Sequence, residues 1–163
     1  MAASADAFLD EPPSSEIAYE VVAPDEPELA RTIAATYEGS LDCPLVDGWR
    51  DIGDVLAGYA ATGTYRPGLW RLIRRGGETL GCLVLSDFPE HSQGELTYLG
   101  IHPNYRGQGL GLAATRWLLH FARNIGWQQL LLAVDANNRP AIEIYVAAGF
   151  EEVTSRRLLA RRL

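Results

Sequence analysis

The chain has 163 residues, of which 47% are hydrophobic, and its formal net charge is −7 at pH 7. This length predicts a single globular unit with one hydrophobic core, and the negative charge argues against nucleic-acid binding. The sequence contains no apolar run of about 18 residues and no secretory signal at its start, so we expect a cytoplasmic protein without a membrane span.

The start of the chain and its cysteines carry further predictions. Residues 1–15 are rich in Ala, Ser, Asp and Pro, which predicts a disordered lead-in before one domain over residues 16–163. The two cysteines show neither CxxC spacing nor a Cys/His cluster, so neither a metal site nor a disulfide is predicted. Cys82 lies in the apolar stretch GCLVL and is expected in the core, whereas Cys43 lies in a predicted loop.

Hydrophobic periodicity and turn residues divide the domain into helices and strands. The predicted strands are 17–23, 69–75, 79–86, 95–101 and 128–134, with two more short strands within 150–163. The predicted helices are 26–37, 49–61, one from 110 to the cap at Gly126, and one from 138 to 148. The order β-α-α-β-β-β-α-β-α-β-β indicates a mixed α/β fold, with a hairpin around the turn GGE.

A glycine-rich segment separates the strand 95–101 from the helix that follows, and it reads Arg106-Gly107-Gln108-Gly109-Leu110-Gly111. A loop at a helix start directs backbone N–H groups outward at the positive end of the helix dipole. Glycines allow a ligand to approach the backbone closely, and Arg106 adds a positive charge. This combination is typical of a phosphate or pyrophosphate site, and the alternative is a tight connection without a ligand.

One ligand class for this loop is a dinucleotide. Residues 109–114 fit the pattern GxGxxA, and Asp135 lies near the end of the next predicted strand. Such a fingerprint normally follows its strand at once and opens the first βαβ unit. Here HPNYR intervenes and about 90 residues come first, which disfavours this ligand class.

The other ligand class comes from a family resemblance. The segment from Arg106 to Gly111 resembles the [Q/R]-x-x-G-x-[G/A] motif of the GNAT N-acetyltransferase superfamily, which binds the pyrophosphate of acetyl-coenzyme A. The later stretch NNRPAIEIYVAAGF resembles that family's second signature, N-x-x-A-x-x-x-Y-x-x-x-G-F. The resemblance covers about residues 79–152 and implies the GNAT fold, a central twisted mixed sheet in which the strand 95–101 splays from the strand 128–134.

The resemblance implies the donor-binding residues. The family's loop motif falls on Arg106, Gly107, Gln108, Gly109, Leu110 and Gly111. Backbone groups of Leu99, Gly100 and Ile101 would pair with the pantetheine arm, and one N–H would polarise the thioester carbonyl. Gly100 is either a β-bulge position or an ordinary strand glycine. Asn138 would bind the pantetheine arm, cap its helix, or do both.

The resemblance also implies two catalytic residues. Tyr145 stands seven residues after Asn138, hence on the same helix face, and would protonate the coenzyme A thiolate; the alternative is a core tyrosine. Glu95 matches a general base of some family members, directly or through water; the alternative is an exposed carboxylate at a strand end. The loop and helix region that would wall the acceptor pocket is acidic, with Glu38, Asp42, Asp47, Asp51 and Asp54 against Arg50.

The sequence thus favours direct acetyl transfer from acetyl-coenzyme A to an amine of a small molecule or protein, and the acidic region favours a cationic amine. A non-catalytic acyl-coenzyme A sensor would need neither Tyr145 nor Glu95, and a nucleotide-binding redox module would bind NAD instead. No metal, nucleic acid or membrane is expected. Some family members dimerise, but nothing in the sequence indicates whether this chain does.

Overall fold

The fold comes from a computed structural model that describes residues 1–13, 16–46, 48–157 and 159, without the side chain of Val46. Its strands are β1 (Ala2–Ser4), β2 (Ala18–Val21), β3 (Trp70–Arg75), β4 (Glu78–Phe88), β5 (Gln93–Ile101) and β6 (Gln129–Leu132). Its helices are α1 (Pro27–Tyr37), α2 (Ile52–Ala60), α3 (Leu110–Asn124) and α4 (Arg139–Ala147). Short 3-10 turns lie at η1 (Ala5–Ala7), η2 (Pro44–Val46), η3 (Pro89–His91) and η4 (Pro103–Tyr105).

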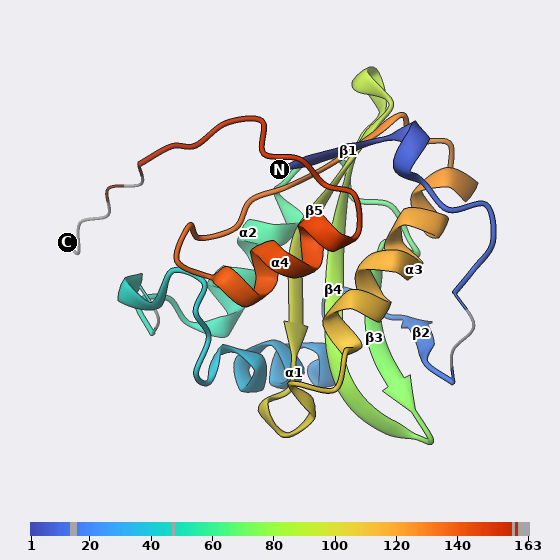
Figure 1. The fold of residues 1–163 in the computed structure, drawn as a ribbon. Coiled ribbons are helices and arrows are strands. Elements are labelled where there is room, and N and C mark those ends of the chain that lie inside the picture. The colour runs from blue at the N-terminus through green and yellow to red at the C-terminus, as the bar shows by residue number, and fades with distance from the viewer. Residues whose placement is uncertain (14–15, 47, 158, 160–163) are drawn as a thin grey trace.

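The six strands form one twisted sheet in the order β1-β6-β5-β4-β3-β2 (Figure 1). All neighbouring pairs are antiparallel except β5 and β6, which are parallel. The predicted hairpin is confirmed: Arg75 pairs with Glu78, and Gly76 and Gly77 both have positive φ. A two-residue hairpin turn favours glycine there because other side chains are strained at positive φ. The mixed α/β class is therefore confirmed.

The helices cover both faces of the sheet. A Cβ placed on Gly100 would meet Thr36 of α1, whereas one on Gly94 would meet Trp127, which follows α3. In Figure 1, α3 and α4 lie side by side across the near face of the sheet, with α2 behind it. Fully buried residues of α1, such as Leu29 and Ile33, pack with the apolar residues of β3 and β4 into one core. None of the described helices is long and apolar enough to span a membrane.

Both ends of the chain differ from the predictions. Residues 2–7, predicted to be disordered, form β1 and η1, and Ala2, Ala3 and the following Phe8 are buried. Ala2–Ser4 pairs with β6, and the Ala2 N–H and C=O each bond to Glu151 at 2.8 Å. The two strands predicted within 150–163 are absent from the described part of that stretch, which has only this bridge at Glu151. The physical reason is that β1 occupies the edge of β6; residues 158 and 160–163 lie outside the description.

Candidate active site

The glycine loop lies between η4 and the start of α3. Gly107 and Gly109 have φ values of +75° and +76°, and a Cβ on either would touch nothing within 4 Å. Their conformation, not lack of space, therefore favours glycine. Within the described chain, no acceptor is found for the backbone N–H groups of residues 107–112. These donors at a helix N-terminus suit an anion such as the pyrophosphate of coenzyme A.

The side chains of the loop serve the protein's own structure. Leu110 is buried in the core, and a Cβ on Gly111 would come within 3.0 Å of Ile144, so the third glycine lets α3 approach α4. The Gln108 side chain accepts a hydrogen bond of 3.2 Å from the guanidinium of Arg75, at the end of β3. The loop therefore offers its backbone to a ligand, and Arg75 brings a positive charge next to it.

The Arg106 side chain is held by contacts within the protein. Its guanidinium donates to the carbonyls of Thr36 at 2.7 Å, Glu38 at 2.8 Å and Gly39 at 3.2 Å, at the end of α1. It also donates to the carbonyl of Ile101 at 3.0 Å. This side chain satisfies orphan carbonyls at the negative end of α1 and ties that helix to β5, and its contact with an anion stays a prediction.

The predicted splay is present in the sheet. Parallel pairing of β5 with β6 ends at Leu96 and Leu132. Pairing of β5 with β4, in contrast, continues to Ile101. Past Leu96, no described strand pairs with β5 on the side away from β4. Leu99, Gly100 and Ile101 thus lie on an open strand edge, to which an extended ligand arm can add as a strand does.

The β-bulge lies three residues before Gly100. Val84 of β4 pairs with Tyr98 and Leu85 pairs with Leu96, so Thr97 is the extra residue on β5. Gly100 is regularly paired, and it is glycine because a Cβ would lie 2.4 Å from the Thr36 hydroxyl oxygen. The proposal of a bulge at Gly100 is therefore wrong. The bulge falls at the start of the splayed segment, where it redirects side chains and terminates regular pairing.

The two predicted residues of the second signature lie on or beside α4. Asn138 caps the helix, its side-chain oxygen accepting the Ala141 N–H at 3.4 Å. Tyr145 is 8% exposed, and its ring lies 5.8 Å from that of Phe150. Burial, and secondly the negative charge of Asp42, raises the pKa of the Tyr145 phenol. The phenol therefore keeps its proton at neutral pH, as a general acid must.

Glu95 is half-buried on β5, and burial raises the pKa of its carboxyl. It pairs with Ser86, and paired residues of antiparallel strands project from the same face of a sheet. The Ser86 hydroxyl is 2.7 Å from the Thr97 hydroxyl. Glu95 and Thr97 therefore share a face, which is the face of the cavity described next.

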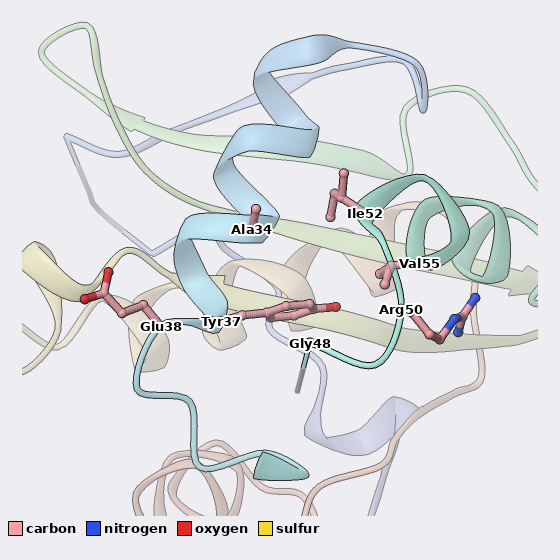
Figure 2. Close-up of a pocket in the computed structure, with 7 residues that line it drawn as sticks. All are labelled: Ala34, Tyr37, Glu38, Gly48, Arg50, Ile52 and Val55. Atoms are coloured by element: carbon pink, nitrogen blue, oxygen red, sulfur yellow. The ribbon is translucent and has the colours of Figure 1, made fainter. Parts of the chain in front are cut away.

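A cavity of about 420 Å³ lies between β5 and the connection from α1 to α2, with Thr97 and Tyr98 in its lining. Its aromatic lining consists of Tyr37, Trp49, Tyr59 and Tyr98. A second cavity of about 330 Å³ adjoins it and shares Tyr37 and Val55 (Figure 2). These volumes lie at the small-molecule end of the range for ligand pockets, roughly 300–1,000 Å³.

The acidic residues predicted to wall this pocket have different roles. Asp42 lines the larger cavity, and Glu38 lines the smaller one but points away from the other side chains there (Figure 2). Asp51 caps α2 by accepting the Asp54 N–H at 2.9 Å. Asp47 lies outside the described residues.

Asp42 and Asp135 form a reciprocal clasp. Asp42 accepts the Asp135 N–H at 2.7 Å, and Asp135 accepts the Cys43 N–H at 3.2 Å. The clasp ties the connection between α1 and α2 to the segment that follows β6. Burial, followed by the charges of Asp42 and Asp135, raises the pKa of Cys43. Its thiol is therefore a weak nucleophile.

Several of these features were not predicted from the sequence. The three clustered tyrosines come from α1, α2 and β5, and Arg75 reaches the loop from 33 residues away. No local pattern marks either set, because only the folded sheet brings them together. The two signatures located the donor loop and Tyr145, and the acidic stretch pointed to Asp42.

Comparison with known proteins places this arrangement in a family. The sequence pattern of the Acetyltransferase (GNAT) family matches residues 26–150, more than half of the chain. The chain therefore belongs to the GNAT acetyltransferase family, which confirms the resemblance carried by the two signatures. Family members use acetyl-coenzyme A.

The relatives of the chain reported next are named as acetyltransferases. The chain is 43% identical over 58 residues to the mycothiol acetyltransferase of Thermobifida fusca, covering 36% of this chain and 18% of that enzyme. It is 35% identical over 86 residues to the uncharacterized N-acetyltransferase YycN of Bacillus subtilis, covering 52% and 55%. The matches thus span only part of these relatives.

Solved structures share the fold. A GNAT family acetyltransferase from Elizabethkingia anophelis, solved with acetyl-coenzyme A bound, has a TM-score of 0.65 at 16% identity. The similarity covers 86% of this chain and 80% of that one. At this identity the likeness concerns the fold alone.

Proposed function

We propose that this chain transfers the acetyl group of acetyl-coenzyme A directly to an amine. The observation that carries the proposal is the row of N–H groups over residues 107–112, which have no acceptor among the described residues, beside the open edge of β5. The N–H groups would hold the pyrophosphate, and the edge of β5 would pair with the pantetheine arm. A thioester aligned along β5 would then lie at the mouth of the aromatic cavity, next to Thr97 and Tyr98.

Each step has a candidate group within this arrangement. The donor would bind to the backbone of Arg106 to Gly111 and to Leu99 to Ile101, with Asn138 at its pantetheine arm. Glu95 would take a proton from the amine, through water because it does not itself line the cavity. A backbone N–H of β5 would polarise the carbonyl. Tyr145 would protonate the departing thiolate.

Direct transfer is favoured over a covalent acyl-enzyme. Cys43 is the thiol in the cavity lining, and its raised pKa keeps it protonated. Cys82, in β4, is fully buried. Both cysteines are free, as is usual in a reducing compartment, which agrees with the proposed cytoplasmic location.

Calorimetric titration with acetyl-coenzyme A, with NAD as the control, tests the proposal. Binding of acetyl-coenzyme A but not NAD, followed by thiol release in the presence of an amine, is the expected result. Binding without turnover of any amine would favour an acyl-coenzyme A sensor, and binding of NAD alone would favour a redox module. All 14 basic residues are arginine, so acetylation of the protein's own lysine side chains cannot confuse product analysis.

A further inference from the structure

Building on the proposed acetyl transfer, we propose that the acceptor is a small primary amine with an aromatic or bulky apolar body, which packs on Tyr37, Tyr59 and Tyr98 with its ammonium group toward Asp42. Three features of the 420 Å³ cavity support this acceptor: its aromatic lining, its fastened wall and its charge.

The tyrosine hydroxyls bond within the protein. The hydroxyls of Tyr37 and Tyr59 lie 2.8 Å apart, and the Tyr98 hydroxyl lies 2.7 Å from that of Thr36. The Tyr59 and Tyr98 rings are stacked at 5.5 Å between centroids, and Tyr37 meets Tyr98 edge-on. With their polar ends held inside the protein, the rings offer a rigid apolar wall. Such a wall favours aromatic or branched alkyl groups over a chain of polar methylene-linked amines.

The clasp favours a small molecule over a polypeptide. The connection between α1 and α2 supplies Asp42, Cys43 and Trp49 to the lining. The bonds between Asp42 and Asp135, and between Asp135 and Cys43, fasten that connection to the segment after β6. A bound peptide would need an open groove in line with β5. The fastened connection instead gives the cavity a wall on that side.

The charge of the cavity selects a cation. Asp42 contributes a carboxylate to the lining, and one of its oxygens accepts the Asp135 N–H. Within the described chain, its other oxygen has no hydrogen-bond partner. Arg50 also lines the cavity, but its guanidinium donates to the Asp54 carbonyl and points away from Tyr37 (Figure 2). Among the described residues of the lining, Asp42 is therefore the acidic side chain available to an ammonium ion, and burial raises the pKa of its carboxyl.

The hydrogen bond from the Asp135 N–H joins Asp42 to the segment that leads to α4, which carries Tyr145. The ammonium loses one proton to solvent through water and the Glu95 carboxylate. Its nitrogen then bonds to the thioester carbon. The carbon–sulfur bond breaks, and the second nitrogen proton ends on the coenzyme A thiolate. The body of the amine stays against the rings throughout, so it contributes to kcat/KM and orients the nitrogen.

Initial rates of thiol release with three amines test this inference. 2-Phenylethylamine represents the proposed class, spermidine a flexible polycation, and a lysine-containing peptide a protein acceptor. We expect kcat/KM for 2-phenylethylamine to exceed that of the other two at least about tenfold. Higher kcat/KM for spermidine or the peptide, or no turnover of 2-phenylethylamine, overturns the inference. The proposed function fails separately, through absence of acetyl-coenzyme A binding in calorimetry.

Two variants test the contacts. Asp42→Asn keeps the oxygen that accepts the Asp135 N–H but removes the charge, so kcat/KM for 2-phenylethylamine should fall about tenfold, with KM for acetyl-coenzyme A unchanged. Asp54→Asn removes the same charge outside the cavity lining and is the matched control. Tyr59→Ala should remove the preference over spermidine, with thermal unfolding checked in parallel. Equal effects of Asp42→Asn and Asp54→Asn contradict the ammonium contact.

Discussion

Replacement of Arg106 separates a structural role from a phosphate-binding role. Its guanidinium makes four hydrogen bonds to carbonyls, at 2.7–3.2 Å, that join the end of α1 to the end of β5. Bonds to charged groups contribute about 1.5–3 kcal/mol each when buried. Because Arg106 is exposed, water competes for most of them, and we take about 2–3 kcal/mol for the four together.

We therefore expect Arg106→Ala to lower the free energy of unfolding by this amount and Tm by roughly 5–10 °C. Arg106→Lys should be nearly as unstable, because an ammonium group cannot span carbonyls of Thr36, Glu38 and Ile101 at once. Tm from circular dichroism and Kd for acetyl-coenzyme A from calorimetry are measured on both variants. KM for the amine should rise, since Tyr37 in the last turn of α1 lines the cavity.

Arg75→Ala is the control, because its guanidinium lies next to the loop through a single bond to Gln108. This variant should unfold within about 2 °C of the parent and bind acetyl-coenzyme A more weakly at low salt. The reasoning about Arg106 is refuted by a different pattern: unchanged Tm in Arg106→Ala, a tenfold loss of acetyl-coenzyme A affinity, and recovery of that affinity in Arg106→Lys.

Three further predictions concern single residues. Gly100→Ala places a Cβ 2.4 Å from the Thr36 hydroxyl oxygen, and it should lower the free energy of unfolding in urea by about 1–3 kcal/mol. For comparison, Gly107→Ala should lower it by about 1–2 kcal/mol, through backbone strain alone. Tyr145→Phe should lower kcat at least about tenfold with little change in acetyl-coenzyme A affinity; unchanged kcat removes the acid role. Glu95→Gln should raise stability at pH 7, because the folded protein holds the Glu95 proton more tightly than the unfolded chain does, and the charged form is therefore disfavoured on folding. The gain should shrink as the pH falls through the raised pKa of folded Glu95 and should be lost below the pKa of an unfolded glutamate, while kcat at pH 7 falls.

Local chemistry made most of the fold predictable. Positive φ at Gly76 and Gly77 suits a tight hairpin, and Pro27 and Asn138 stand at helix starts. The edge strand β1 was missed because Ala2 to Ser4 carry no strand pattern. Their place in the sheet comes from backbone pairing with β6 and with Glu151, more than 120 residues away.

The candidate site was predictable where local sequence patterns mark it, and not where it depends on tertiary contacts. Two signatures located the glycine loop and α4, because each has a fixed local spacing. The direction of the Arg106 side chain was not predictable, since three of its partners lie at the end of α1 and just after it, 67–70 residues earlier. The bulge at Thr97 likewise depends on the register between β4 and β5, which no residue of β5 specifies by itself.

The two halves of the site share their supports. Arg106 lies in the donor loop but holds the end of α1, which carries Tyr37 into the acceptor cavity. Asp42 lies in the acceptor wall but is clasped to Asp135, in the segment that leads to α4 and Tyr145. Each support thus joins an element of one half to an element of the other, and Asp42→Asn is informative because it removes the charge while keeping the bond to Asp135. Tyr145 has no hydrogen bond to either support within the described chain, so we expect its replacement to alter the proposed chemical step with little effect on binding.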